Sequence, residues 1–492
     1  MNQKLIILLF TFIAYSLALA AQTNLHVGTQ NRVVVFARFK DDPEIDTPRS
    51  YFDRIFNGEN NSLKSYFKAI SNGQLTINSY LYPANTGENT SFELKYCYYC
   101  YDNDWKGNYP NCKGKDITSA SDINIGFIIK ELAGKLEESE NILEASMLDN
   151  DNDGYVDNFV IVLRGAGRGP GKGIYTPHVG TISEVFTKAQ GPILLKGKTI
   201  RNYTITFERN SLDTHCRFLL NYMGFPNAYP TQGSSPRFVG PWDPTDGPQL
   251  SYPLIYNRMK YSNNNWINSI PEITQPGEYT LSPAHEATNN AYKISSSDPQ
   301  QYWIVEYRDN GAAYENNLPE AGLLIYRVDT RYSGVAGKNT EIYLFRKDGT
   351  PSCPGEVTEA AFSDINGRTA FSSETNPYPF FTDGSTFNDL AIYDITLKNG
   401  LISFRINKVY TDIQESYMSG WNIHVASDSP RTLLLQGEGI EEVSIFDLSG
   451  RSLHSFNINN KKSIKLSDLA SGVYIARLRN DVKEQMYKFI LE

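Results

Sequence analysis

The segment from Asp149 to Asp157 carries acidic side chains at alternate positions, which is the spacing of a loop that binds a hard cation. Ca²⁺ prefers carboxylate and carbonyl oxygens, and Gly154 stands at the sixth place, where such loops turn sharply. The sequence therefore predicts a structural calcium site with four aspartate side chains and one backbone carbonyl group as ligands: Asp149, Asp151, Asp153, Asp157 and Tyr155.

The loop differs from the calcium loop of a helix–loop–helix hand. Its twelfth place holds Val160, where such a hand has a bidentate glutamate, and residues 158–163 are typical of a buried strand. A preceding helix is predicted from the helical spacing of Ile125, Ile128, Leu132 and Leu136. We expect calcium to tie this helix to the strand; the alternative is an acidic, Asn-rich turn that binds only water.

A second set of polar side chains lies on a helix predicted from Leu212 to Met223. Arg217 and Asn221 are four residues apart and share one face of this helix. Gly224 follows the last turn, as is typical of a helix end. Apolar residues at helical spacing predict the buried stripe, in which a cysteine is expected as a buried thiol: Leu212, Cys216, Leu219, Leu220 and Met223.

The surroundings of this helix resemble the active-site helix of the immune inhibitor A-like zinc metalloproteases. In that family His-Glu-x-x-His is followed by a residue, an apolar residue, Gly, another residue, Pro-Asp and an aromatic residue. Here residues 223–229 read Met-Gly-Phe-Pro-Asn-Ala-Tyr. This register places Arg217 and Asn221 where the family has its zinc-binding histidines, Phe218 where it has its glutamate, and Asn227 where it has the downstream aspartate.

The resemblance covers about residues 30 to 400 and implies an α+β zinc-metalloprotease-like core followed by a β-sandwich domain. The chemistry of that family needs two neutral imidazoles on the metal and a glutamate that takes a proton from the metal-bound water. A guanidinium cation, a phenyl ring and a neutral amide cannot replace them. We therefore expect no functional catalytic residue at Arg217, Phe218, Asn221 or Asn227, and no bound Zn²⁺.

The chain's six histidines do not restore the helical two-histidine motif, because no two of them lie within five residues of each other. We expect the guanidinium of Arg217 to occupy the place of the metal and to pair with Glu208 or Asp213. His215 is expected on the polar surface of the helix, because it faces away from Arg217.

Three functions are compatible with these residues. The first is a catalytically inactive relative of the proteases that binds a protein or peptide in the vestigial cleft. The second is a working zinc endopeptidase with unconventional ligands, such as His178 and His215. The third is a structural or adhesive protein whose binding surface is the Tyr-rich segment from Cys97 to Tyr109.

The composition and the first residues indicate an exported protein. A formal net charge of −9 over 492 residues argues against a nucleic-acid partner. Residues 1–20 are typical of a secretory signal peptide, with one lysine, a short apolar stretch and an Ala-Leu-Ala ending, and no later segment is apolar enough to span a membrane. One local disulfide is expected among Cys97, Cys100 and Cys112, since a fourth ligand for a zinc knuckle is absent nearby.

The last seventy or so residues alternate between polar and apolar side chains, as small antiparallel strands do. The runs Phe-Asp-Leu-Ser-Gly-Arg, from Phe446, and Leu-Ala-Ser-Gly-Val-Tyr, from Leu469, resemble the C-terminal sorting domain of the type nine secretion system of Gram-negative bacteria. The alternative is a fibronectin-like module. The resemblance implies export through the periplasm to the cell surface or the medium, with the type nine secretion machinery as a partner.

Length and these motifs together predict a multidomain chain of about three domains. The expected order is a signal peptide at residues 1–20, the metalloprotease-like domain at 24–267, the β-sandwich domain at 268–408, a connector at 409–421 and the small C-terminal β-sandwich at 422–492.

Overall fold

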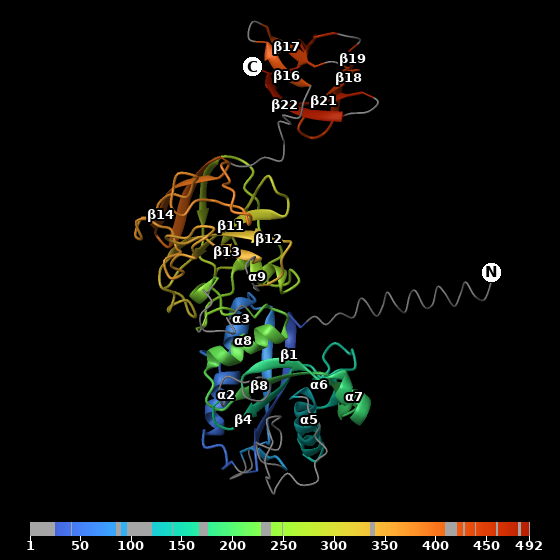
Figure 1. Cartoon of the computed structure of the whole chain (residues 1–492), viewed down its shortest axis with the longest axis vertical. Coiled ribbons are helices and arrows are strands. Elements are labelled where there is room, and N and C mark those ends of the chain that lie inside the picture. Colours follow the sequence, from blue (N-terminus) through green and yellow to red (C-terminus); the bar gives the residue numbers. More distant parts are fainter. Residues whose placement is uncertain are drawn as a thin grey trace, which may run out of the picture. The chain divides into compact units, whose positions relative to one another are not determined.

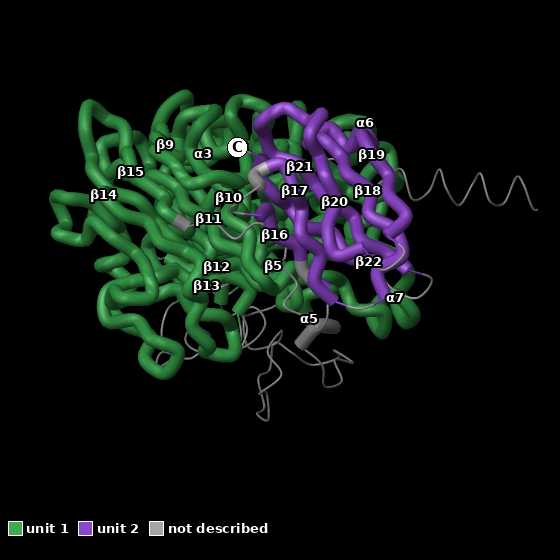
Figure 2. The backbone as a smooth tube through the Cα atoms, turned by 90° about the horizontal axis from the view of Figure 1, so that it is seen from above, with its two compact units in different colours: residues 1–409 green, residues 410–492 purple. Residues whose placement is uncertain are grey.

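The computed structural model describes residues 25–491 apart from 41, 85–89, 96–120, 140, 167–175, 228–237, 248, 335–339, 409–420, 427–428, 438, 459–460 and 481–483. The chain forms two compact units (Figure 1, Figure 2), which we call the first unit, residues 1–409, and the second unit, residues 410–492. The expected signal peptide, the Cys97, Cys100 and Cys112 trio and the Tyr-rich segment up to Tyr109 lie outside the described residues.

A mainly parallel sheet lies at the centre of the first half of the first unit. Its strand order is β2-β1-β4-β8-β5, with β3 also paired to β1, and only β5 runs antiparallel to its neighbour. The strands are β1 Gly28–Arg38, β2 Leu75–Tyr82, β3 Phe92–Glu93, β4 Phe159–Leu163, β5 His178–Thr181 and β8 Asn202–Phe207, with a separate hairpin of β6 Ile193–Leu195 and β7 Lys198–Ile200.

Helices cover both faces of this sheet (Figure 1). Val34 and Phe36 of β1 pack with α2, α3 and α8 on one face, whereas Val33 and Val35 pack with α5 and α7 on the other. Strand β4 is apolar throughout because both of its faces are buried, as expected. The helices are α2 Arg49–Asn57, α3 Leu63–Ile70, α5 Ser121–Glu137, α6 Ala145–Leu148, α7 Glu184–Gln190, α8 Leu212–Tyr222 and α9 Ile255–Lys260, with a 3₁₀ turn at Gly240–Trp242.

Antiparallel sheets make up the rest of the first unit. Their strand orders are β10-β11-β12-β13 and β14-β15-β9. Arg258 of α9 donates to the carbonyl oxygens of Ile70 (2.8 Å) and Ala284 (2.7 Å), so the division expected at residues 267/268 lies within one compact unit. The strands are β9 Gly277–Leu281, β10 Ala291–Ser295, β11 Gln301–Arg308, β12 Gly322–Asp329, β13 Ile342–Leu344, β14 Ala391–Lys398 and β15 Leu401–Lys408.

The second unit consists of two antiparallel sheets around one apolar core, as its alternating sequence predicts. The core includes Trp421, which the sequence placed in the connector; its carbonyl accepts a hydrogen bond from the hydroxyl of Tyr487 at 2.6 Å. One sheet contains β16 Asn422–Ala426, β17 Ser429–Gln436 and β20 Ser463–Lys465; the other contains β18 Glu442–Phe446, β19 Ser452–Asn457, β21 Gly472–Arg479 and β22 Glu484–Leu491.

The architecture is therefore mixed α/β, with most strands in several separate sheets and a β-rich C-terminal unit. In the described part of the chain, no helix combines the length and the apolar character needed to cross a membrane.

Candidate functional site

Helix α8 lies on one face of the parallel sheet and carries Arg217, Phe218 and Asn221, the positions at which the sequence resemblance expects a zinc motif. It extends from Leu212 to Tyr222, one residue short of the predicted end. Cys216, Leu219 and Leu220 are buried against the sheet, as the periodicity predicts. Gly224 follows with a φ of 93°, a backbone conformation that favours glycine.

The side chains at these positions make contacts within the fold. Phe218 is 7% exposed, and the guanidinium of Arg217 lies over its ring at 5.2 Å. The side-chain amide of Asn221 donates to the carbonyl of Phe225 at 3.2 Å, just beyond the end of the helix. Asn227 is exposed in the loop that follows. The amide of Asn221 and the ring of Phe218 therefore both have partners within the fold.

The two carboxylates expected beside Arg217 lie in different surroundings. Burial raises the pKa of Asp213, and the nearby positive charge of Arg217 acts against this rise. Glu208 accepts hydrogen bonds from the backbone N–H groups of Thr47 and Gly165, both at 2.9 Å. The charge of Arg217 therefore acts on Asp213.

The expectation that His215 is a surface residue is wrong. Its imidazole is 1% exposed and packs edge-on against the ring of Phe56, with centroids 4.9 Å apart. Burial, assisted by the positive charge of Arg32, lowers the pKa of His215 to about 3. The spacing contained the signal, because His215 is three residues after Leu212 and four before Leu219 and so lies in the same apolar stripe.

The alternative zinc ligands, His178 and His215, come from different environments. His178 is partly buried on β5, and its Nδ1 lies 2.9 Å from the carbonyl oxygen of Thr176. Within the described ranges, the only group of three or more His, Cys, Asp or Glu side chains with ligand atoms within 4.8 Å of one another is Asp149, Asp151 and Asp153. Neither histidine belongs to it.

The acidic loop brings three of its predicted ligands together around buried Asp149. This carboxylate accepts hydrogen bonds from the backbone N–H groups of Asp153 (2.9 Å) and Gly154 (3.0 Å). Its Oδ2 also lies 2.5 Å from the Nζ of Lys198, a cation from β7 that sequence spacing did not reveal. Burial opposes ionisation, but Lys198 and these N–H groups hold the pKa of Asp149 below its usual value.

The other acidic side chains of the loop repel one another. Burial, together with the charges of Asp153 and Asp149, raises the pKa of Asp151. Asp157 accepts hydrogen bonds from the backbone N–H and side-chain amide of Asn150, at 2.7 and 3.2 Å, and burial raises its pKa to about 6. A bound cation would favour all these carboxylates in their charged form.

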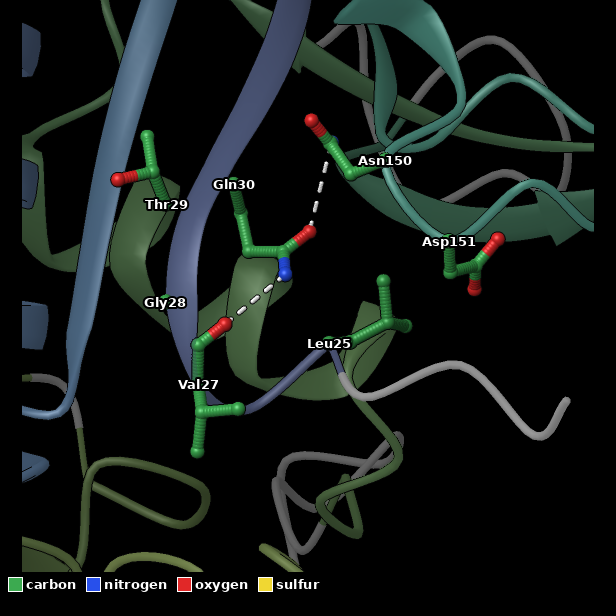
Figure 3. A pocket seen from close by; sticks show the side chains of 7 residues that line it. All are labelled: Leu25, Val27, Gly28, Thr29, Gln30, Asn150 and Asp151. Atoms are coloured by element: carbon green, nitrogen blue, oxygen red, sulfur yellow. Dashed lines mark hydrogen bonds between the residues drawn. The ribbon is translucent and has the colours of Figure 1, made fainter. Parts of the chain in front are cut away.

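A pocket of about 250 Å³ adjoins this loop (Figure 3). Gln30 crosses it: its amide donates to the carbonyl of Val27 at 3.1 Å, and its oxygen lies 3.5 Å from the amide nitrogen of Asn150. The residues that line the pocket come from the segment before β1, from the start of β1 and from the acidic loop: Leu25, Val27, Gly28, Thr29, Gln30, Asn150 and Asp151. The pocket therefore gives solvent access to one side of the acidic loop.

Comparison with known proteins bears on the second unit. No curated protein matches the chain. Residues 422–492 match the family described as a secretion system C-terminal sorting domain, and these residues form the antiparallel sandwich described above. The chain therefore carries a C-terminal type nine secretion sorting domain, which indicates export to the cell surface or the medium and is consistent with a Gram-negative bacterium.

Proposed function

We propose that this chain is an exported member of the immune inhibitor A-like family whose first unit binds a protein or peptide without cleaving it. One observation carries the proposal: the helix in the register of the zinc motif presents Arg217, Phe218 and Asn221 in place of the two histidines and the glutamate. The guanidinium repels Zn²⁺, the phenyl ring accepts no proton, and the amide of Asn221 is engaged with Phe225.

The metal content and peptidase activity of the purified protein test this proposal. We expect sub-stoichiometric zinc after dialysis and no hydrolysis of casein above background, with or without a chelator. Stoichiometric zinc that survives dialysis, or casein hydrolysis that a chelator abolishes, would contradict the loss of the site.

Restoring the motif tests the family relationship separately. The variant Arg217→His, Phe218→Glu, Asn221→His, Asn227→Asp restores all four motif positions, with two imidazoles one helical turn apart and a carboxylate downstream, and we expect it to bind about one zinc ion per chain. Arg217→His alone is the matched control, because it adds one imidazole without a partner and should bind no stoichiometric zinc. Failure of the folded quadruple variant to bind zinc would contradict the proposed register.

We also propose that the acidic loop binds Ca²⁺ as a structural ion through Asp149, Asp151, Asp153, Asp157 and the carbonyl of Tyr155. The clustering of three carboxylates and the raised pKa of Asp151 and Asp157 support this proposal, because a divalent cation would relieve their repulsion. Calcium would supply charge and oxygen coordination only, with no part in a reaction.

Lys198 provides a sharp test of the calcium site. Its ammonium group lies on Asp149 and repels an incoming cation, so we expect Lys198→Met to bind Ca²⁺ about tenfold more tightly, as measured by isothermal titration calorimetry. Asp151→Asn should weaken binding. Lys188→Met, which changes an exposed lysine paired with Glu184, is the control and should have no effect. Equal calcium affinity in the Lys198→Met and wild-type proteins would contradict this placement of the ion.

The sorting domain makes a prediction about export. Removing residues 410–492 deletes the second unit but leaves the first unit intact, and we expect the shortened chain to be retained within the cell envelope. Immunoblotting of medium, surface and envelope fractions measures this. The tryptophan fluorescence of the shortened chain, compared with the full chain, checks that the first unit still folds; a folded, shortened chain that still reaches the medium would contradict the prediction.

A further inference from the structure

Arg32, on the central strand β1, is a buried cation without a counter-charge. It is 2% exposed, and its Nε and Nη1 have no hydrogen-bond partner among the described residues. Its guanidinium lies 5.4 Å from the centre of the Phe56 ring, and no described carboxylate forms an ion pair with it. Burying an unpaired charge costs free energy of folding, so we expect a partner that compensates the charge of Arg32.

Other buried arginines of the first unit show how this fold satisfies a guanidinium. Each of the three nitrogens of Arg258 donates a hydrogen bond, to Ile70, Ala284 and Asn72, at 2.7–2.8 Å. Arg308 pairs with carboxylates and also donates to backbone carbonyl oxygens. Arg49 and Arg327 each leave one buried nitrogen without a partner, but each still donates to a backbone carbonyl oxygen, of Thr90 and Phe380 respectively. Arg32 differs in that two of its nitrogens lack partners and no carboxylate among the described residues pairs with it.

Further unsatisfied polar groups surround Arg32. His215 packs on the same Phe56 ring, and neither of its ring nitrogens has a partner in the described structure. Ser79 is paired with Arg32 across β1 and β2, so both side chains leave the sheet on the same face, and the buried Ser79 hydroxyl also lacks a partner there. The charge of Arg32 also acts on the thiol of Cys216 and on His215. Two strands and a helix therefore bring unsatisfied donors to one buried place.

We propose that this place binds a small monovalent inorganic anion of the chloride class, held by Arg32 with Ser79 and His215 beside it. A single negative charge would neutralise the one buried cation, and the guanidinium N–H and serine hydroxyl groups are donors suited to it. Water would satisfy the hydrogen bonds but would leave the charge uncompensated. The small size follows from the burial of all three side chains.

The thermal stability of the full-length protein in different salts tests the anion site. At equal ionic strength, we expect the melting temperature of the first unit to be about 2 °C higher in sodium chloride than in sodium gluconate. A crystal grown in sodium bromide should show an anomalous peak within hydrogen-bond distance of Arg32 Nε and Nη1. Equal melting temperatures in the two salts, or an ordered water in that position and bromide only on the surface, would overturn the proposal.

Two variants separate this site from a general salt effect. Arg32→Met should abolish the difference between chloride and gluconate. Arg258→Lys changes an arginine that is equally buried but fully partnered, and it should keep the difference. A chloride effect that persists in Arg32→Met would overturn the proposal. If Arg32→Met does not fold, the proposal is tested by the same salt comparison on Ser79→Ala and by the salt comparison and the bromide map of the wild-type protein.

Discussion

Replacing Arg308 with methionine is expected to destabilise the first unit by about 3–5 kcal/mol. Its guanidinium is fully buried between Glu306 and Glu315, donating to Glu315 Oε2 at 2.8 Å and lying 3.3 Å from Glu306 Oε1. Burial opposes the charge, but these carboxylates raise the pKa of Arg308 above its usual value. Without the cation, two buried carboxylates would lose their ion-pair partner.

The same guanidinium joins parts of the chain that are far apart in sequence. It donates to the carbonyl oxygens of Trp242 (2.8 Å) and Tyr252 (2.9 Å), in the segment after α8, while Glu306 accepts from the backbone N–H of Ile255 at 2.8 Å. These bonds hold that segment against β11. The Arg308→Met variant should therefore lose the packing of Trp242 as well as an ion pair.

Urea unfolding followed by tryptophan fluorescence measures the effect of Arg308→Met. Arg405→Met is the matched control, because Arg405 forms an exposed ion pair with Asp394 at 2.8 Å and its loss should cost less than about 1 kcal/mol. Similar small losses for both variants would show that the buried pair contributes no more than a surface pair. Replacing Glu315 with glutamine in the Arg308→Met background should recover part of the stability, since one uncompensated charge is then removed.

Local sequence patterns predicted local structure well. The helical spacing and Gly224 predicted α8 to within one residue, and the apolar run at residues 158–163 predicted a buried strand, which the structure shows as β4, buried on both faces. The alternating residues after Trp421 predicted the antiparallel sandwich, and the match to the sorting domain confirms that assignment. In each case the periodicity that predicts the element lies among residues that are neighbours in sequence.

Long-range contacts were not predictable in the same way. Lys198 reaches Asp149 because the β6–β7 hairpin folds back on the acidic loop, and Arg308 meets Glu315 and Trp242 only after β11 is in place. His215 is a different case from Lys198 and Arg308. Its spacing places it in the apolar stripe of the helix, but the polar character of its side chain led to the expectation of a surface position. Its burial follows from the packing of Phe56 of α2 over the helix, a contact between residues far apart in sequence.

The buried imidazole of His215 should make the first unit sensitive to acid. Its pKa of about 3 in the folded protein lies below the value of 6.5 for a free histidine, so the unfolded chain binds the proton more readily. The contribution of the neutral His215 to the free energy of unfolding is therefore fully present above about pH 6.5. It falls by about 1.4 kcal/mol per pH unit as the pH decreases toward 3. At pH 5 the expected loss from this residue is about 2 kcal/mol.

The groups that face His215 either lower its pKa further or are uncharged. The cation of Arg32, on β1, disfavours a second positive charge, the ring of Phe56 is apolar, and burial keeps the neighbouring thiol of Cys216 protonated by raising its pKa. Asp213, at the start of α8, has a raised pKa because of burial, so acid neutralises it as well. In the absence of the proposed anion, none of these groups provides a negative charge that would stabilise an imidazolium in acid, so the pH series belongs in sodium gluconate.

His215→Phe keeps an aromatic ring against Phe56 and removes the titration, so we expect a shallower loss of stability between pH 6.5 and 4.5 than in the wild-type protein. Urea unfolding at a series of pH values measures this difference. Leu219→Ala, on the same buried stripe, is the control: it should lower stability by about 2–5 kcal/mol at every pH and leave the slope unchanged. If His215→Phe and the wild-type protein lost stability in parallel, the imidazole would have to be protonated within the fold, and the helix would have to move to expose it.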